Sequence, residues 1–543
     1  MATILIRNGK IIDGSGNPAF EGSLLLRDNR IEAVIERGEV LPEADRIIEA
    51  EGLAVAPGFI DMHSHADWVL PLDRNAEILK CLVEQGITTV VGGNCGFSPA
   101  PVVPEKKHLI DAPAAMLVDE PLAYDWRTMD EFLNRVVDAK PIVNLAELVG
   151  HAAVRYCNTD TLRGPMTPEE LARCLDDERK AFDDGACGLS FGLGYDPGMY
   201  SPTEELDAFC AVAAKAGVPV TVHLKAQSVV SPCYVNEPSD TPHNERALTE
   251  MLDVARRTGC RLQLSHFIFV GRSTWGTADR CIQLVEEARQ EGVDVMIDAF
   301  PVTCGNTTIL APFPYWFLSE YPAAFENEEM QRRLEPELDF GFAFVGFTYS
   351  DFQVMDAAVP GWEDLNGLRI TDIAQKWQCT PFAAMFKLAA ASLGATLMLF
   401  HAYSGEPGNE EVLEKVLSCD YCLFETDAAI KSTGYPNPAA LGAFPRVLGE
   451  FVRNRKLFSL ENAVKRMTSE SAKRFGLKDI GLIKPGMAAD VVVFNPETIL
   501  DTPFLDMQAA VKPAGIEHVF INGRHAVING DYVKGIQAGR VLR

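Results

Sequence analysis

The pattern of apolar and polar positions divides this chain into a long central part and two shorter ends. From about residue 58 to about residue 475, short apolar runs alternate with amphipathic stretches whose apolar residues recur at helical spacing. The amphipathic stretches, which we expect to be helices, include Glu169–Asp184, Glu204–Ala216, Glu245–Thr258 and Ala278–Gln290. The apolar runs, which we expect to be strands, are Gly58–Met62, Thr88–Val91, Ile142–Leu148, Gly188–Phe191, Val218–Leu224, Arg261–Ser265, Asp294–Asp298 and Tyr421–Phe424. Strands that alternate with helices in this number predict an α/β fold of the (β/α)8 TIM-like barrel type.

A doubly wound open sheet is the alternative interpretation of the same alternation. Many such sheets bind a nucleotide through a glycine-rich loop that follows a strand, and the sequence contains no loop of that pattern. The barrel is therefore the favoured fold.

Both ends of the chain show short strands separated by turn residues. In residues 1–57 and 476–543 the apolar runs are interrupted by Asn8-Gly9, Asn522-Gly523 and Asn529-Gly530, pairs that are typical of hairpin turns. We expect the two ends to pair into one small β-sandwich domain, with the barrel of residues 58–475 between them.

The alternation within the barrel breaks at about residues 305–370. The break begins with a stretch rich in aromatic residues and proline, Pro312–Phe317, and continues with charged, irregular sequence. We predict an insertion that caps the active site, because barrel active sites lie at the strand ends from which such insertions extend. A surface excursion without function is the plainer interpretation, but so many aromatic side chains favour a pocket lining or an interface in a homo-oligomer.

Composition and charge narrow the range of partners and compartments. The 543 residues include 49 Lys and Arg against 76 Asp and Glu, a formal net charge of −27. So acidic a chain makes nucleic acid and anionic membranes poor partners, and we expect a small-molecule substrate. The 13 cysteines are scattered, which is typical of reduced thiols in a cytoplasmic protein. The N-terminus reads as a first strand rather than a signal peptide, and the apolar stretch Phe382–Phe400 is too interrupted for a membrane span.

Residues that can bind a metal ion stand at the ends of the predicted strands. His63 and His65 lie two positions apart, so on a strand they point to one face and can bind the same ion. Cys95 follows the second strand, and a thiolate beside imidazoles favours zinc over magnesium or calcium. Three further strands end at His223, His266 and Asp427. Because barrel active sites form at the carboxyl ends of the strands, these six residues predict a metal site.

Taken singly, each of these residues has a plainer explanation, since free cysteine is commonly buried and inert. Their common position at strand ends is what favours a functional site. Two other histidines, His151 and His401, also lie beside predicted strands. Each is interpreted either as a core histidine or as a neighbour of the site.

Several motifs resemble those of a known family. The segment Pro57–His65 (PGFIDMHSH) is similar to the opening motif of the amidohydrolase superfamily, and Gly481–Asp490 (GLIKPGMAAD) is similar to the superfamily's return into its β domain. Gly93–Ser98 (GNCGFS) resembles the narrower D-aminoacylase branch, the N-acyl-D-amino-acid deacylases, in which a cysteine replaces the carboxylated lysine of other members. Gly188–Gly198 and Phe444–Gly449 are also similar to that branch.

The resemblance implies a zinc-dependent site with divided roles. It implies one tightly held zinc on Cys95, His223 and His266. It also implies an adjoining position, weaker or vacant, formed by His63, His65 and Asp427. In such a site zinc lowers the pKa of bound water from about 15.7 to roughly 7, which makes hydroxide available to attack a carbonyl. Asp427 would accept the proton as general base and pass it to the departing nitrogen as general acid.

Three positions depart from the branch, because apolar residues stand where polar substrate anchors are expected. They are Ile268, Val302 and Ala440. A substrate carboxylate entering such a pocket would lose its hydration without gaining a cationic partner, which favours a more apolar substrate. Lys225 and Arg272 remain as substitute partners for a carboxylate.

The sequence as a whole predicts a zinc-dependent hydrolase that cleaves an amide-type C–N bond of an N-acyl compound. The candidate substrate-binding residues are Lys225, Tyr195, Arg272, Ile268 and His151. One alternative is a true N-acyl-D-amino-acid deacylase, and another is an esterase or lactonase, because the same zinc chemistry acts on those bonds. A metal-binding relative without turnover is the remaining alternative, and the presence of all six site residues argues against it.

Overall fold

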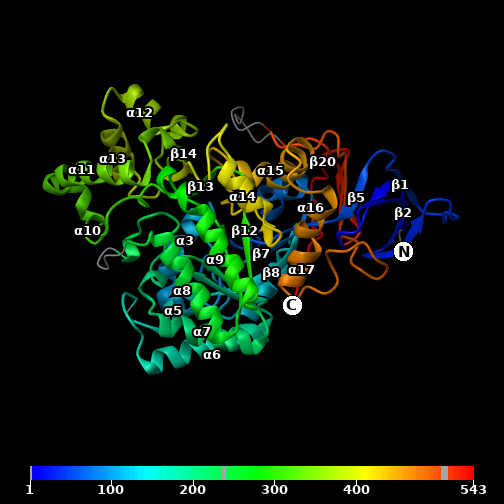
Figure 1. Ribbon diagram of the computed structural model, residues 1–543, viewed down its shortest axis with the longest axis horizontal. Helices are drawn as coiled ribbons and strands as arrows, with labels where there is room; N and C mark the ends of the chain where they lie inside the picture. Colours follow the sequence, from blue (N-terminus) through cyan, green and yellow to red (C-terminus); the bar gives the residue numbers. More distant parts are fainter. Residues whose placement is uncertain (1–2, 161, 235–239, 503–511) are drawn as a thin grey trace.

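The computed structural model describes residues 3–160, 162–234, 240–502 and 512–543, and an eight-stranded parallel sheet lies at its centre (Figure 1). The strands are β6 (Phe59–Asp61), β7 (Ile87–Gly92), β8 (Asn144–Gly150), β9 (Gly188–Gly192), β10 (Pro219–His223), β11 (Arg261–Leu264), β12 (Val295–Ala299) and β16 (Cys422–Phe424). Their spatial order follows the chain, and all neighbours are parallel. A doubly wound sheet would reverse its order partway, so this topology is that of the predicted barrel.

Contacts between β16 and β6 bring the two edges of this sheet together. The amide of Asp427 donates to the carbonyl of His63 at 3.0 Å. The amide and the hydroxyl of Thr426 donate to the buried Asp61 carboxylate at 2.9 and 2.7 Å. The sheet thus closes on itself, and the predicted α/β barrel fold is confirmed.

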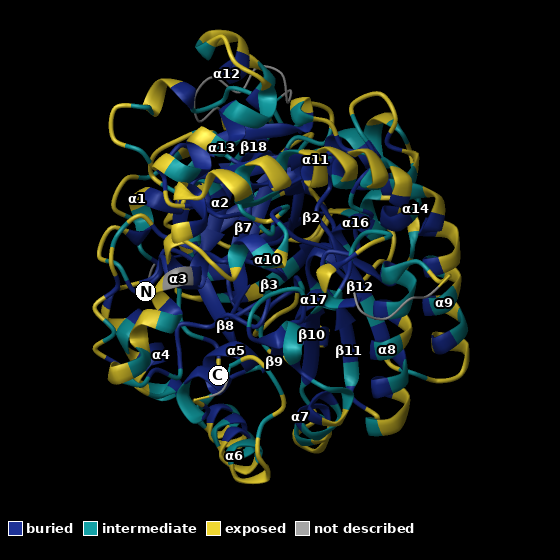
Figure 2. Cartoon of the chain, turned by 90° about the vertical axis from the view of Figure 1, so that its left-hand side faces the viewer, coloured by how far each residue is buried: buried dark blue, intermediate teal, exposed yellow. Residues whose placement is uncertain are grey.

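Helices surround the barrel, and local sequence sets their ends. They are α1 (Asn75–Ile78), α2 (Lys80–Glu84), α3 (Lys107–Leu117), α4 (Met129–Asp138), α5 (His151–Asn158), α6 (Pro168–Asp184), α7 (Thr203–Ala216), α8 (His243–Thr258), α9 (Ala278–Gln290), α14 (Glu411–Ser418), α15 (Pro438–Arg446), α16 (Leu460–Met467) and α17 (Ser469–Arg474). Thr128 and Thr167 begin α4 and α6 with reciprocal capping hydrogen bonds, and Gly185 ends α6 in the left-handed region. The barrel strands are buried, whereas the helices expose their outer faces (Figure 2). Within the described ranges, no helix combines the length and apolar composition that a bilayer crossing requires.

The two chain ends form a second sheet of nine strands at one end of the molecule (Figure 1). Its strands are β1 (Thr3–Ile11), β2 (Phe20–Arg27), β3 (Arg30–Glu36), β4 (Arg46–Glu49), β5 (Ala54–Pro57), β17 (Val491–Phe494), β18 (Ile516–Ile521), β19 (Arg524–Ile528) and β20 (Asp531–Tyr532). The ends join where β17 pairs antiparallel with β5. Along β17, Val491 and Val493 pack in the sheet's own core, whereas Val492 and Phe494 pack with the barrel core. Strands β1 to β5 contribute to the same small core, so both chain ends share one sheet and one core, where a β-sandwich of two packed sheets was expected.

Two of the three Asn-Gly pairs form the predicted hairpin turns. Asn522-Gly523 connects β18 to β19, and Asn529-Gly530 connects β19 to β20, all with positive φ. The prediction of a turn at Asn8-Gly9 is wrong, because β1 pairs with β2 on both sides of this pair. The register shifts there instead, and the left-handed φ of Asn8 (61°) accommodates a β-bulge.

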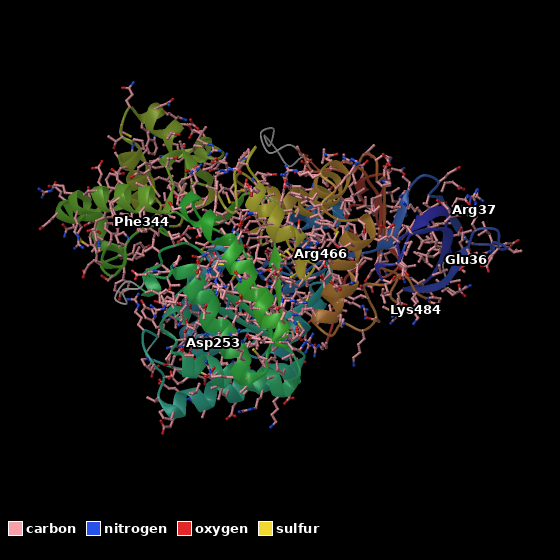
Figure 3. The ribbon with its side chains drawn as sticks, in the orientation of Figure 1. Glu36, Arg37, Asp253, Phe344, Arg466 and Lys484 are labelled. Atoms are coloured by element: carbon pink, nitrogen blue, oxygen red, sulfur yellow. The ribbon has the colours of Figure 1, made fainter. Side chains whose placement is uncertain are left out.

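Between β12 and β16 the chain leaves the barrel and forms a separate unit. Its antiparallel sheet has the order β13 (Cys304–Thr308), β15 (Leu397–His401) and β14 (Phe352–Asp356). The accompanying helices are α10 (Tyr315–Leu318), α11 (Glu328–Val345), α12 (Ile370–Trp377) and α13 (Pro381–Ala391). This inserted unit has its own apolar core and continues beyond residue 370, because β15 is its central strand. It lies at the end of the molecule opposite the terminal sheet, as the positions of Phe344 and Glu36 show in Figure 3.

Arg272 ties the inserted unit to the barrel. Arg272 follows β11 in the chain. Two of its guanidinium nitrogens donate to the two carboxylate oxygens of Asp351, at 2.8 and 3.0 Å. It also donates to Glu406 at 2.6 and 2.9 Å, in the segment that returns to the barrel. Since Asp351 is buried, its carboxylate depends on this cationic partner.

Replacing Arg272 with alanine should destabilise the protein by about 1 to 3 kcal/mol, because the buried Asp351 carboxylate loses its partner. Thermal or denaturant unfolding measures this loss. The matched control is Arg280→Ala on α9, whose ion pair with Glu287 joins two exposed side chains and should contribute at most about 1 kcal/mol. Equal losses in the two variants would contradict the role of Arg272 as a tie.

Candidate metal centre

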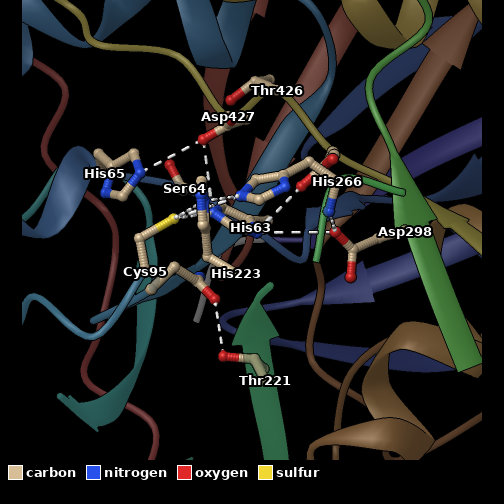
Figure 4. Close-up of polar contacts among 12 residues, drawn as sticks. His63, Ser64, His65, Cys95, Thr221, His223, His266, Asp298, Thr426 and Asp427 are labelled. Carbon is tan, nitrogen blue, oxygen red and sulfur yellow. Dashed lines mark hydrogen bonds and ion pairs between the residues drawn. The ribbon is translucent and has the colours of Figure 1, made fainter. Parts of the chain in front are cut away.

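The six residues that stand at predicted strand ends lie together at the carboxyl ends of the barrel strands (Figure 4). His63 and His65 follow β6, Cys95 follows β7, His223 is the last residue of β10, His266 follows β11, and Asp427 follows β16. Parallel strands of a barrel all end at one rim, so residues distant in sequence meet there. The position of the site is therefore a consequence of the topology.

Cys95, His223 and His266 form one compact set of donor atoms. Cys95 Sγ lies 3.5 Å from His266 Nε2 and 3.8 Å from His223 Nδ1, and these two nitrogens are 2.8 Å apart. A tetrahedral zinc ion with ligands at about 2.0 to 2.3 Å holds its ligand atoms roughly 3.5 Å apart. The two sulfur–nitrogen distances match this spacing, whereas the two nitrogens lie closer together. One thiolate and two imidazoles are a donor set that suits zinc and leaves a fourth position for water.

A second set adjoins the first and shares the cysteine with it. Asp427 Oδ1 lies 3.4 Å from His63 Nε2 and 3.3 Å from His65 Nε2. Cys95 Sγ lies 3.4 Å from His63 Nε2 as well. The thiol therefore stands between the two sets, and the site can hold either one metal ion or two adjoining ones.

Three of the six residues adopt backbone conformations that are uncommon outside glycine. The φ angles are 54° at Cys95, 32° at His266 and 44° at Asp427. Such conformations cost of order 1 to 3 kcal/mol each and concentrate at functional sites. Each lies just past the end of a strand, where the chain turns while its side chain remains directed at the shared centre.

Burial and neighbouring charges act in opposite directions on these groups. Burial favours the neutral thiol of Cys95, but His63 and His266 outweigh it and lower the pKa well below its ordinary value. The thiolate is the form that binds zinc. At His223, burial and then His266 both lower the pKa, so the imidazole is neutral and able to bind a metal ion.

Residues outside the predicted set contact two of the imidazoles. The side-chain amide of Gln227 lies 2.6 Å from His266 Nδ1, and the His266 amide donates to Asp298 at 2.7 Å. Asp298 and Glu425 lie 3.6 and 3.1 Å from His63 Nδ1. The sequence pattern could have identified these two acids, because each stands at the end of an apolar strand, as the six candidate ligands do. Gln227 lies in a loop and offered none.

Two of the candidate substrate-binding residues, the half-buried Tyr195 and the buried Ile268, pack with the barrel core. The ring of Tyr195 lies against that of His223, with 4.4 Å between centroids. Ile268 is buried in the loop that follows β11. His401, the other histidine considered from the sequence, contacts Gln353 in the inserted sheet, with 3.0 Å between Nε2 and Oε1.

The other three candidates are engaged with carboxylates. Lys225 Nζ lies 2.7 Å from Glu250 Oε1, and His151 Nε2 lies 2.8 Å from Glu205 Oε1. Arg272 makes the ion pairs to the inserted unit described above. Each of the three side chains is thus already paired with a carboxylate of the protein.

Comparison with known proteins places this geometry in a family. The sequence pattern of the amidohydrolase family matches residues 46–304 and 423–527. The stretch between these two segments contains the inserted sheet. An N-acyl-D-glutamate deacylase from Alcaligenes xylosoxydans xylosoxydans is 33% identical in sequence, over 99% of this chain and 96% of its own length.

Solved structures show the same fold over nearly the whole chain. An N-acyl-D-glutamate deacylase from Bordetella bronchiseptica, complexed with zinc and a phosphonate mimic of the tetrahedral intermediate, has a TM-score of 0.80 and 29% identity, with 99% of both chains covered. A D-aminoacylase with a binuclear metal centre has a TM-score of 0.78 and 26% identity, again over 99% of both chains.

The fold and these relatives define a metal-dependent hydrolase that acts on carbon–nitrogen bonds other than peptide bonds. The chain belongs to the amidohydrolase family, and its homologues are metal-dependent N-acyl-D-amino-acid deacylases. The resemblance found in the sequence motifs is thereby confirmed.

Replacing Cys95 with alanine should remove bound zinc and hydrolytic activity together, because the variant loses the thiolate that both donor sets share. Metal analysis of the purified protein measures the zinc, and product release measures activity. The control is Cys379→Ala, since Cys379 is exposed and lies in the inserted unit. A Cys95→Ala protein that keeps stoichiometric zinc and full activity would remove Cys95 from the site.

Proposed function

We propose that this protein is a zinc-dependent hydrolase that cleaves the amide-type C–N bond of an N-acyl compound. The observation that carries the proposal is the convergence of the six candidate ligands at one point of the barrel rim. When bound there, zinc supplies the Lewis acid and the activated water that amide hydrolysis requires. The deacylase relatives support the same class of reaction.

Asp427 is the group that moves protons in this proposal. Burial raises the pKa of Asp427, but His63, His65 and His266 outweigh burial and lower it. The carboxylate is therefore ionised and able to accept a proton from the attacking water. The same oxygen then returns the proton to the leaving nitrogen, so that the amine departs in neutral form.

We expect the two donor sets to bind zinc with different affinities. We assign the tighter zinc to Cys95, His223 and His266, because in this set the shared thiolate is joined by imidazoles alone. The set with the harder Asp427 oxygen provides the weaker or vacant position. A related D-aminoacylase offers a parallel, since it is described as activated by one metal and attenuated by a second.

The substrate is uncharged at the position where N-acyl-D-amino acids carry their carboxylate. Ile268, Val302 and Ala440 are 8%, 6% and 3% exposed, and their side chains offer no polar atom to a substrate. Lys225 and Arg272 are engaged in ion pairs. A carboxylate that enters such surroundings loses hydration without gaining a counter-charge.

The second candidate is a true N-acyl-D-amino-acid deacylase, which the 33% identity to the N-acyl-D-glutamate deacylase favours. A matched substrate pair separates the two candidates: N-acetyl-D-leucine and N-acetyl-D-leucinamide differ only in the charge of one terminal group. We expect the zinc-loaded enzyme to have the higher kcat/KM on the amide, measured by release of acetate. A clear preference for N-acetyl-D-leucine, or for N-acetyl-D-glutamate tested alongside, would overturn the proposal of an uncharged substrate and would support an N-acyl-D-amino-acid deacylase instead.

Replacing Asp427 with asparagine should lower kcat by roughly 10²- to 10⁴-fold, the usual contribution of a general acid–base group. The zinc content of the tight position should be unchanged, because Asp427 belongs to the other donor set. Asp420→Asn makes the same substitution at an exposed residue near β16 and serves as control. Loss of all zinc from Asp427→Asn would instead assign this residue to tight metal binding.

A further inference from the structure

Two buried carboxyl groups lie behind His63, on the side of the ring that faces away from Cys95 and Asp427. The His63 Nε2 faces the candidate metal ligands, at 3.4 Å from both Cys95 Sγ and Asp427 Oδ1. The opposite nitrogen, Nδ1, lies 3.1 Å from Glu425 Oε2 and 3.6 Å from Asp298 Oδ1. Both acids are fully buried. His63 is thus held between the metal centre and a pair of carboxyls.

The two carboxyls differ in what else they bind. Asp298 Oδ1 accepts a hydrogen bond from the His266 amide at 2.7 Å, and Asp298 Oδ2 accepts one from the Gln263 side chain at 2.6 Å. Asp298 is therefore already engaged by the His266 amide and the Gln263 side chain. Within the described residues, neither oxygen of Glu425 makes a hydrogen bond of normal geometry. Its shorter distance to His63 makes it the carboxyl available to that imidazole.

A buried carboxyl that only filled space would be unfavourable. Removing a carboxyl from water without compensating contacts costs several kcal/mol, whereas an apolar side chain of similar volume would pack at no such cost. Buried polar groups without ordinary hydrogen bonds are rare and call for a functional explanation. The nearest charged partner of Glu425 on the metal side is His63, so the explanation lies with this imidazole.

We propose that Glu425 is a positioning residue that orients His63 for metal binding. His63 Nδ1 and Glu425 Oε2 lie 3.1 Å apart without a hydrogen bond of normal geometry. With a metal ion on Nε2, Glu425 Oε2 would accept the Nδ1 proton, and the lone pair of Nε2 would be directed at the metal position beside Cys95 and Asp427. The inference rests on the proposed metal-dependent function and deepens it, because it names the residue that sets the ring orientation in the second donor set. The Cys95, His223 and His266 set does not depend on this contact.

The test is a metal titration of Glu425→Gln, which keeps the shape of the side chain and replaces the carboxyl by an amide. Zinc binding to the metal-free protein is followed in competition with a chelator, so the readout needs no substrate. We expect the affinity of the second, weaker metal to fall about 10- to 100-fold, the usual effect of losing a group that orients a metal-binding histidine, while the first zinc binds as in the unaltered protein. Glu425→Asp, which keeps the carboxyl on a shorter side chain, should recover part of the loss.

Glu178→Gln is the matched control. Glu178, on α6, is also fully buried and also makes no hydrogen bond of normal geometry among the described residues, but it lies outside the six-residue centre. It should leave both metal affinities unchanged. If Glu425→Gln folds and binds both metals as the unaltered protein does, or weakens both equally, the positioning role is overturned. Because no substrate is used, a failed hydrolase assay would count against the proposed function and not against this inference.

Discussion

Closure of the barrel between its first and last strands is the contact on which the candidate site depends. The Asp427 amide donates to the His63 carbonyl, and Thr426 binds Asp61 beside it, so β16 is fastened to β6. Two members of the second donor set, His63 and Asp427, lie at this seam itself. In an open sheet these residues would stand at opposite edges, and Cys95 could not be close to all of its partners.

Charge balance explains how so many ionisable groups can be buried in one place. A lone thiolate, carboxylate or imidazolium would be costly inside a barrel, because each loses its hydration. At the rim they are opposed to one another: His63 and His266 lower the pKa of the Cys95 thiol. Cys95 and then Asp427 raise the pKa of His63 and His266, and of the three acidic groups Glu425 acts on His63 most strongly. Each buried charge is therefore stable only while its partners are present. A bound metal ion adds positive charge that offsets the thiolate and the carboxylate. Glu425 extends the same network one step behind the centre.

The inserted unit and the barrel differ in how they relate to the family pattern. The family pattern covers most of the barrel and strands β4, β5, β17 and β18 of the terminal sheet, but leaves residues 305–422, nearly all of the inserted unit, unmatched. The candidate ligands all come from the matched part, consistent with a reaction shared across the family. The inserted unit has its own core and is tied to the barrel by Arg272. This division allows recognition to change while the chemistry at the strand ends is retained.

The sequence by itself determined the barrel strands, the pairing of the chain ends and the six candidate ligands. These follow from local patterns: apolar runs at strand spacing, and metal-binding side chains at the ends of those runs. Only the tertiary structure decided which charged and polar side chains are paired with which partners. It showed Lys225 held by Glu250, Arg272 held by the inserted unit, Glu425 placed behind His63, and Asn8 in a bulge rather than a turn. The reason is physical, since an ion pair or a strand register joins residues far apart in the chain. Among 76 acidic residues, no local pattern says which one a given cation or imidazole will meet.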